Sequence, residues 1–387
     1  MGFLGSWKRL LPVQLTLIYI FFGSGLVVNF LQFLSFLLIR PFNLKLYRKV
    51  NYYLAYSFWS NLTFMAQYWS GSDCVIYLDE ESYKQINKEN FICIMNHKYD
   101  IDWLMGWIIC QRAGLLGGSK IIGKSSLRFV PLIGWCWVFT ESIFIDRKWE
   151  SDKVKLKEGL DKNLAVYPDG YFFNVLMFCE GTRFTKIKHE ESMKIARAKG
   201  LPELKHHLLP RTKGFSLIAK GARERIPAIY DLNVGIVEKD GRRADLNTIR
   251  YGLPLNGEIF IRRIPLSDVP SDEEESAKFI HKFYQEKDEI YDVFAKNGTF
   301  ESLGVKKITL EKNYYDLYIT IFWFMLLFVP ALFWLINFIT KASFLMNGIL
   351  LAISLSLSFM AEMLISISKI DKGSKYGLKE DSIKKSD

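Results

Sequence analysis

The sequence predicts an α/β domain whose sheet is flanked by helices, placed between an N-terminal membrane helix or helix pair and a C-terminal transmembrane hairpin. Two observations support this prediction. Three long segments contain no charged residue, and from about Asp73 the chain alternates short apolar runs with charged helical patterns, as α/β domains do. We therefore expect a membrane anchor with an amphipathic interfacial helix, an α/β domain, two transmembrane helices and a basic tail at residues 1–72, 73–312, 313–368 and 369–387.

The uncharged segments are long enough to enter a membrane. Leu10 to Ile39, Leu317 to Thr340 and Ala342 to Ala361 contain thirty, twenty-four and twenty residues without a charge. About twenty apolar residues suffice to cross a bilayer. The first segment is too long for a signal peptide, so we expect the anchor to be retained. Gly23-Ser24-Gly25 near its middle leaves two forms open, one long tilted helix or a re-entrant helical pair.

A second apolar pattern follows the first segment at helical spacing. Its members are Leu54, Phe58, Leu62, Met65 and Trp69. Tyrosines and a tryptophan lie among them, which suits the headgroup layer of a membrane. A helix packed against a protein core shows the same stripe, so this alternative stays open.

Short apolar runs and capping signals give the elements of the α/β domain. The expected strands are Phe91 to Met95, Val138 to Ile145, Phe172 to Cys179 and Ile226 to Val234. One helix is expected from an N-cap at Ser151 to Tyr167, before Pro168, and another from Phe215 to Arg225. A capping box of Ser271 and Glu274 predicts the start of a long helix that ends at Gly298.

The net charge of +10 is compatible with nucleic acid, anionic lipid or a phosphorylated ligand. Basic residues flank the first apolar segment, and no acidic residue precedes Asp73, so a phospholipid membrane and phosphate are the expected partners. No nucleic-acid-binding motif accompanies the charge, and we expect no nucleic acid. The five cysteines lack C-x-x-C spacing, so neither a disulfide framework nor a metal site is expected.

The order of the segments also predicts an orientation. The last two apolar segments are joined near Lys341 and form a hairpin, whose ends must lie on one side of the membrane. Lysines after Lys369 place that side in the cytosol by the positive-inside rule. The final Lys384-Lys385-Ser386-Asp387 resembles a retrieval signal of endoplasmic reticulum membrane proteins. We expect a multi-pass protein of that membrane, with its α/β domain and tail cytosolic and the sequons at Asn61 and Asn297 unused.

A polar loop between the first strand and the next helix carries the clearest chemical signal. Asn96 and His97 open this loop, and Asp102 closes it where an apolar helix begins. Active sites lie in loops at strand ends, and a strand-to-helix turn can fold a carboxylate back onto an imidazole. His97 and Asp102 are therefore a candidate base and its orienting acid. Asp100 is the alternative partner of the imidazole.

Other predicted strands end in charged clusters. Phe144 and Arg147 close one strand, and Glu180-Gly181-Thr182-Arg183 closes another. Backbone N–H groups and a hydroxyl at Gly181 and Thr182, beside two guanidinium groups, suit an oxyanion such as phosphate. Pro227 marks a third stretch of this kind. These clusters predict a phosphorylated ligand near His97.

Together, these blocks resemble the glycerolipid acyltransferases. Asn96-His97 with Asp102 matches their H-x4-D box, Phe144 to Arg147 their F-x-x-R box and residues 180–183 their EGTR box, while Pro227 occupies the place of the fourth block. Further stretches resemble the gamma and delta branch of animal 1-acylglycerol-3-phosphate acyltransferases, and they lie at residues 120–137, 148–150, 208–215 and 284–288. The resemblance covers nearly the whole chain and implies the mixed sheet of the glycerolipid acyltransferase fold.

The resemblance implies an enzyme that transfers an acyl group from acyl-CoA to the sn-2 hydroxyl of lysophosphatidic acid, giving phosphatidic acid. His97 would be the general base and Asp102 its partner, without an acyl-enzyme, a metal or a bound cofactor. A glycerophosphate-binding role falls on Lys124, Arg147, Glu180, Gly181, Thr182 and Arg183.

Two departures leave other functions open. Cys179 and Tyr230 stand where the family often has proline, which leaves the acceptor open to lysophosphatidylinositol or lysocardiolipin. A non-catalytic lipid-binding membrane protein is a further alternative. Such a protein would be expected to have lost residues of the H-x4-D or EGTR box, and both boxes are intact here. A metal-dependent phosphohydrolase is disfavoured because no two histidines pair at ligand spacing in a box.

Overall fold

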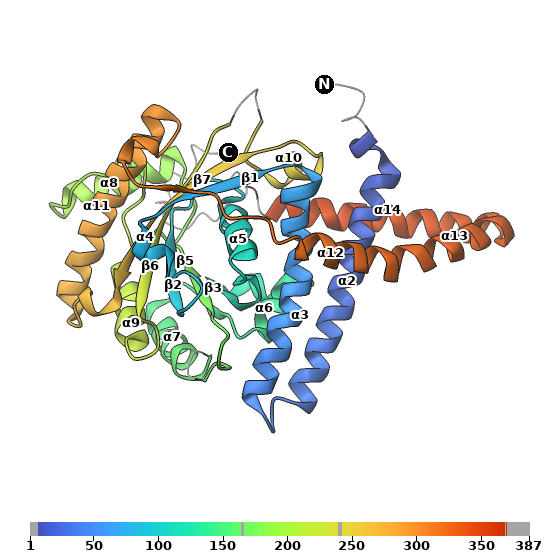
Figure 1. Ribbon diagram of the computed structural model, residues 1–387, viewed down its shortest axis with the longest axis horizontal. Helices are drawn as coiled ribbons and strands as arrows, with labels where there is room; N and C mark the ends of the chain where they lie inside the picture. Colours follow the sequence, from blue (N-terminus) through green and yellow to red (C-terminus); the bar gives the residue numbers. More distant parts are fainter. Residues whose placement is uncertain (1–6, 164–165, 239–241, 368, 370–387) are drawn as a thin grey trace.

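The chain forms one mixed eight-stranded sheet with helices on both faces. A computed structural model describes residues 7–163, 166–238, 242–367 and 369 (Figure 1). The strands, in the order β4-β3-β5-β2-β6-β7-β1-β8 across the sheet, are β1 (Asp73–Tyr77), β2 (Phe91–Met95), β3 (Ser119–Lys124), β4 (Ile143–Ile145), β5 (Asn174–Met177), β6 (Ala228–Ile236), β7 (Asn256–Pro265) and β8 (Lys307–Ile308). This confirms the predicted α/β class with a mixed sheet.

Five neighbouring strands run in the same direction. β2 pairs in parallel with β5 and β6, and β3 pairs in parallel with β5 and β4. The remaining pairs are antiparallel β6–β7, parallel β7–β1 and antiparallel β1–β8. The carboxyl ends of β2 to β6 therefore share one edge of the sheet. The loops that follow these strands meet there.

Both faces of the sheet are buried. Along β2, Phe91, Cys93 and Met95 pack into one apolar core, while Ile92 and Ile94 pack into the other. α5 covers the first face, and α7, α9 and α11 cover the second. The helices of the domain are α4 (Glu80–Tyr83), α5 (Asp102–Arg112), α6 (Ile133–Phe139), α7 (Trp149–Asn163), α8 (Lys186–Ala198), α9 (Thr212–Ala222), α10 (Leu246–Arg250) and α11 (Glu273–Asn297).

Short helical turns complete the description. They are η1 (Trp7–Arg9), η3 (Leu116–Gly118), η4 (Ser125–Phe129), η5 (Leu266–Asp268) and η6 (Glu301–Leu303), with π-helical turns at η2 (Met65–Trp69) and η7 (Phe324–Phe328).

Several predicted boundaries were wrong. The expected strand Val138 to Ile145 begins as the end of α6, and only its last residues form β4, because the chain turns at Glu141 with φ 61°. α7 begins at Trp149, so Ser151 lies inside the helix and its hydroxyl donates to the carbonyl of Lys148. The cap of α11 is Asp272 rather than Ser271, since its carboxylate accepts from two N–H groups of the first turn.

The first apolar segment is a single helix. α2 (Leu11–Leu38) continues without a break through the glycine pair, so the re-entrant alternative is wrong. α3 (Leu44–Phe64) returns beside it, and a Cβ at Gly25 would lie 2.9 Å from the Phe58 ring and 2.8 Å from Leu132. Glycine therefore permits the close approach of the two helices.

The second apolar pattern is packed against protein on one face. Phe58 and Trp59 on α3 are fully buried, and the Trp59 ring lies 4.8 Å from that of Trp107 on α5. The core-packed alternative therefore holds for this face of α3. Asn61 is also buried, and its amide donates to the hydroxyl of Ser24 on α2, which leaves no room for a glycan at that sequon.

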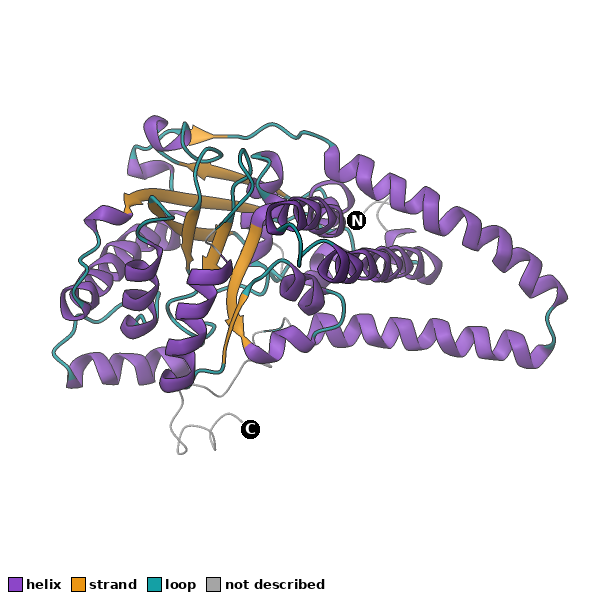
Figure 2. Ribbon diagram, turned by 90° about the horizontal axis from the view of Figure 1, so that it is seen from below, coloured by secondary structure: helices purple, strands orange, loops and turns teal. Residues whose placement is uncertain are grey.

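The C-terminal segments form a long helical hairpin. It consists of α12 (Tyr315–Trp323), η7, α13 (Val329–Lys341) and α14 (Phe344–Ile367). Among the described residues, three helical segments are long and apolar enough to cross a membrane, namely α2, the run from α12 to α13, and α14. α2 and α3 are seen end-on in the view where α13 and α14 lie in the plane (Figure 2). The hairpin therefore runs across α2 rather than alongside it.

Candidate functional site

Polar side chains gather at the shared carboxyl edge of the parallel strands. His97 follows β2, Lys124 ends β3, Arg147 follows β4, and residues 180–183 follow β5. Because these strands are parallel neighbours, their ends lie side by side. The sheet thus brings together segments that are far apart in the sequence, as the predicted strand ends indicated.

His97 and Asp102 are in direct contact. His97 Nδ1 lies 2.9 Å from Asp102 Oδ2. Asp102 is fully buried as the first residue of α5, where its carboxylate also accepts from the backbone N–H of Trp103 at 2.8 Å. This bond fixes the carboxylate at the start of the helix. The ring of His97 is therefore oriented with Nδ1 toward Asp102 and Nε2 away from it.

The His97 side chain is held by packing and is still partly exposed to solvent. Its ring stacks on Phe178 with centroids 3.9 Å apart, and the His97 carbonyl accepts from the N–H of Phe184 at 2.8 Å. The side chain keeps 15% of its surface exposed. Asp100, the predicted alternative partner, is buried in the same loop, whereas the carboxylate 2.9 Å from His97 Nδ1 is that of Asp102.

Asn96 fastens the loop to the neighbouring strand. Its amide donates to the carbonyl of Val234 at 3.0 Å, and its side-chain oxygen accepts from the N–H of Val234 at 2.7 Å. The side chain therefore extends the pairing of β2 with β6 by one position. These two hydrogen bonds to β6 fix the point at which the His97 loop leaves the sheet.

Glu180 faces the protein backbone. Its buried carboxylate accepts from the N–H groups of His97 at 3.3 Å and Leu208 at 3.1 Å. Burial raises the pKa of Glu180 to about 7. The residue joins the end of β5 to the His97 loop, so the structure assigns its carboxylate to backbone support.

The turn after Glu180 presents the polar groups of the EGTR box. Gly181 has φ 72°, a left-handed conformation that glycine adopts at little cost. The Thr182 hydroxyl accepts from Lys188 Nζ at 2.7 Å. Arg147 and Arg183 both help to lower the pKa of Lys188, so the three cations form one cluster. Lys188 was not predicted; the available signal was a lysine on the inward face of α8.

The other motif residues at this edge differ in backbone conformation and in how far their side chains are exposed. Arg147, two residues before α7, adopts a left-handed backbone with φ 64°. Such strain in a non-glycine residue costs of order 1–3 kcal/mol and is typical of functional sites. Lys124 lies at the same edge with an exposed side chain. Phe144 is buried in β4, under the guanidinium of Arg128 at 5.4 Å.

Pro227 does not lie with these groups. It precedes β6, at the opposite edge of the sheet from His97, and its carbonyl accepts from the N–H of Leu266. Further along the same block, Asp231 is fully buried and pairs with Arg262 on β7 at 2.7 Å. Asp231 also pairs with Lys287 on α11. The fourth block therefore contributes packing and a buried ion-pair network that the sequence did not reveal.

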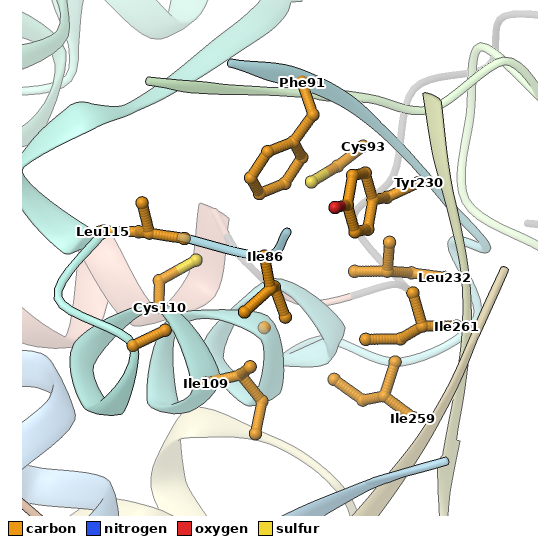
Figure 3. A pocket seen from close by; sticks show the side chains of 12 residues that line it. Ile86, Phe91, Cys93, Ile109, Cys110, Leu115, Tyr230, Leu232, Ile259 and Ile261 are labelled. Carbon is orange, nitrogen blue, oxygen red and sulfur yellow. The ribbon is translucent and has the colours of Figure 1, made fainter. Parts of the chain in front are cut away.

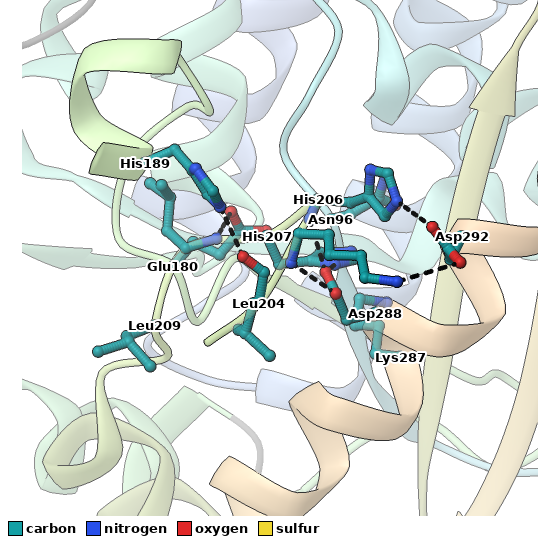
Figure 4. A network of polar contacts seen from close by, with 12 residues as sticks. Asn96, Glu180, His189, Leu204, His206, His207, Leu209, Lys287, Asp288 and Asp292 are labelled. Atoms are coloured by element: carbon teal, nitrogen blue, oxygen red, sulfur yellow. Dashed lines mark hydrogen bonds and ion pairs between the residues drawn. The ribbon is translucent and has the colours of Figure 1, made fainter. Parts of the chain in front are cut away.

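A second network supports the segment that carries Leu208 (Figure 4). His207 Nδ1 lies 2.8 Å from Asp288 Oδ1, and His206 Nε2 lies 2.9 Å from Asp292 Oδ1. Burial lowers the pKa of His207 to about 4, so this ring is neutral at pH 7. These contacts give both histidines a structural role. They hold residues 204–208 where Leu208 can donate to Glu180.

The cavity shown in Figure 3 lies away from this edge. It measures about 30 Å³, lies between α5 and the sheet, and is lined by apolar side chains with Cys93 and Cys110. That volume holds one water-sized group and no acyl chain. Among the described residues, no three histidine, cysteine, aspartate or glutamate side chains gather as metal ligands.

Two family models match this chain. The family model described as Acyltransferase matches residues 76–236, and the model described as Acyltransferase C-terminus matches residues 248–323. The first match contains the whole edge from His97 to Lys188.

Similar relatives extend over nearly the full chain. The 1-acyl-sn-glycerol-3-phosphate acyltransferase delta of Bos taurus is 41% identical over 95% of this chain and 95% of the relative. The gamma enzyme of Homo sapiens is 39% identical over 98% of this chain and 99% of the relative. The crystal structure of the 1-acyl-sn-glycerophosphate (LPA) acyltransferase PlsC from Thermotoga maritima is 20% identical, with a TM-score of 0.38 over 71% of this chain and 96% of that chain.

Proposed function

This chain belongs to the 1-acyl-sn-glycerol-3-phosphate acyltransferase family, and we propose that it transfers an acyl group from acyl-CoA to the sn-2 hydroxyl of lysophosphatidic acid, giving phosphatidic acid. The observation that carries the proposal is the 2.9 Å contact between His97 Nδ1 and Asp102 Oδ2. It lies at the same sheet edge as Arg147 and Arg183. A base and a phosphate-binding cluster on one edge match an acceptor that carries both a hydroxyl and a phosphate.

His97 acts as the general base. With its Nδ1–H donated to Asp102, the ring offers the unprotonated Nε2 to the sn-2 hydroxyl. As Nε2 takes the proton, the hydroxyl oxygen attacks the thioester carbonyl carbon and a new C–O bond forms. The C–S bond then breaks, and the proton passes from His97 to the thiolate, so that CoA leaves as a thiol. Asp102 stabilises the imidazolium between these two transfers.

The cationic cluster positions the acceptor. Arg147 and Arg183 bind the phosphate oxygens, with the Thr182 hydroxyl and the Gly181 backbone beside them. Lys124, at the same edge, extends the positive potential around the phosphate. Because the Glu180 carboxylate accepts a hydrogen bond from the His97 N–H at 3.3 Å, it links the proposed base to the turn of the phosphate site. Holding both reacting groups in this way lowers the entropic part of the barrier.

The proposed reaction proceeds without an acyl-enzyme. A CoA thiolate is a good leaving group, so deprotonation of the acceptor and alignment with the thioester supply the main part of the acceleration. The proposed partners are acyl-CoA as co-substrate, lysophosphatidic acid and the phospholipid membrane. The proposal includes no metal and no bound cofactor.

We further propose that the protein resides in the endoplasmic reticulum membrane with its α/β domain and tail in the cytosol. The hairpin returns α14 toward the domain, where Glu362 pairs with Arg250 at 2.7 Å, so the chain leaves the membrane on the side of the domain. Lysines in residues 369–387 favour the cytosolic side. The retrieval-like Lys384-Lys385 lies outside the described residues.

The test is acyl transfer by the purified full-length chain. Radiolabelled acyl-CoA is supplied with lysophosphatidic acid, lysophosphatidylinositol or monolysocardiolipin, and the products are separated. We expect wild-type protein to form phosphatidic acid and His97→Ala to lose about 10²–10⁴-fold in rate, the usual contribution of a general base. His281→Ala on α11 is the matched control and is expected to retain the rate. A near-normal rate of His97→Ala would falsify the mechanism.

A further inference from the structure

Lys188 is a buried cation at the edge that carries the proposed phosphate site. It lies in the first turn of α8, only 6% of its surface is exposed, and its ammonium donates to the Thr182 hydroxyl at 2.7 Å. A hydroxyl satisfies one of its three donors and does not neutralise its charge. The side chain is therefore held toward the turn after β5 with its charge uncompensated by this contact.

The charged groups that act most strongly on Lys188 are cations. Burial, together with repulsion from Arg147 and Arg183, lowers the pKa of Lys188 to about 8. Glu191, one turn along α8, is ion-paired with Lys194 at 2.7 Å. No carboxylate among the described residues forms an ion pair with Lys188. A buried cation beside two arginines is costly unless a ligand supplies negative charge.

We propose that Lys188 is a specificity-determining residue that selects a phosphate monoester over a phosphate diester at this site. The inference rests on the proposed function, in which Arg147 and Arg183 bind the acceptor phosphate. Those two guanidinium groups can bind the oxygens of either ester. Lys188 adds a third positive charge at the turn of Thr182. A phosphate monoester has a second negative charge that can pair with this ammonium, and a diester does not.

The charge of the ligand decides the preference. A phosphate monoester carries close to two negative charges at pH 7, since its second pKa lies near 6, whereas a diester carries one. In a site from which water is partly excluded, an additional ion pair has a more favourable interaction energy than it has in water. Lysophosphatidic acid is a monoester, while lysophosphatidylinositol is a diester of similar acyl content. Lys188 should therefore favour the first as acceptor.

The first experiment compares Lys188→Met with wild type for both acceptors. Lys186→Met is the matched control, because that lysine lies on the same helix with an exposed side chain. We expect the ratio of kcat/KM for lysophosphatidic acid to that for lysophosphatidylinositol to fall about tenfold or more in Lys188→Met, as expected for losing a charge-assisted bond. The change should appear mainly in KM for lysophosphatidic acid, and Lys188→Arg should restore part of it.

An unchanged ratio would overturn the inference. So would a rise confined to KM for acyl-CoA, which would assign Lys188 to the phosphates of CoA. If wild type acylates no lysophosphatidic acid, the proposed function itself fails. If wild type is active and the ratio is unaffected, only the role of Lys188 fails.

A second experiment uses the unaltered protein and does not depend on how the variants fold. Glycerol 3-phosphate and glycerophosphoinositol serve as soluble competitors against lysophosphatidic acid. We expect glycerol 3-phosphate, the monoester, to compete at concentrations about tenfold lower. Equal inhibition by the two compounds would contradict a preference for the doubly charged phosphate.

Discussion

His97 is held by contacts of different kinds, and each of them restricts one degree of freedom. Asp102 fixes the ring nitrogen at 2.9 Å, Phe178 fixes the ring plane, and Glu180 fixes the backbone. Asn96 fixes the loop against β6. If His97 is the base, as proposed, a ring held in this way needs little reorganisation when the acceptor binds.

Glu180 predicts a measurable dependence of stability on pH. Its folded pKa of about 7 lies above the ordinary value of 4.5, so the folded chain binds more protons than the unfolded chain between these values. The contribution of Glu180 to the free energy of unfolding is therefore largest at low pH and falls as the pH rises from about 4.5 to about 7. Glu180→Gln removes the titration. Thermal unfolding of both proteins across this range should show a wild-type advantage that shrinks as the pH rises.

The titration of His207 changes the free energy of unfolding in the opposite direction. Wild type must therefore be compared with Glu180→Gln at each pH. The folded pKa of His207, about 4, lies below the ordinary 6.5, so its contribution is lost as the pH falls through that interval. The difference between wild type and Glu180→Gln cancels this background. A wild-type advantage that grows with pH would contradict the assigned environment of Glu180.

Three helices begin at the edge that carries the site. α5 begins at Asp102, α7 at Trp149 and α8 at Lys186, each immediately after one of the functional loops. Helix N-termini carry partial positive charge, so the edge is electropositive even before its side chains are considered. The polarity of the elements and the placement of the arginines thus favour an anionic acceptor.

The packing of α2 on α3 predicts a glycine requirement within one element. Gly25→Leu would place its Cβ 2.9 Å from the Phe58 ring, which is fully buried, so the two helices must separate. We expect a loss of about 1–3 kcal/mol in the free energy of unfolding, as is usual for overpacking. Gly348→Leu on α14 is the matched control, because its Cβ meets no atom within 4 Å. Denaturant unfolding in detergent measures both, and equal stability of the two variants would disprove the tight contact.

At the scale of the molecule, both ends of α2 meet the α/β domain. Near its start, the Gln14 amide donates to the carbonyl of Arg250 at 3.3 Å. Just beyond its end, Arg40 pairs with Glu141 at 3.8 Å. A helix that crosses a bilayer has its ends on opposite sides, so we expect α2 to lie along the membrane and the hairpin, which runs across α2 (Figures 1 and 2), to enter it. The exposed apolar side chains of α2 then face the acyl chains of one leaflet.

This arrangement predicts which positions are accessible from the side of the domain. Phe42→Cys, after α2, and Ser271→Cys, before α11, should react with a membrane-impermeant maleimide in sealed microsomes. Ser343→Cys at the tip of the hairpin should react only after permeabilisation. The background is low because four of the five native cysteines are buried. Protection of Phe42→Cys until permeabilisation would show that α2 crosses the membrane.

Some elements were predictable because their signals are local. β2 matches its prediction at both ends, since a run of β-branched and apolar residues is bounded by a polar loop. β7 was missed because Arg262 and Arg263 interrupt its apolar pattern. The structure neutralises them with Asp231 at 2.7 Å and Glu89 at 2.7 Å, partners that are distant in the sequence. In β7, ion pairs with distant residues allow charged side chains to occupy a strand that has no continuous apolar pattern.

The sequence by itself determined which residues form the proposed base and the EGTR box, because each lies in a loop next to its own strand and parallel strands bring such loops to one edge. Only the tertiary structure decided where the side chains point. It turned the Glu180 carboxylate toward backbone N–H groups, moved Pro227 to the far edge and brought Lys188 to Thr182. The physical reason is that strand order and helix packing depend on contacts between distant segments, and these contacts set the burial and the charge environment of each group.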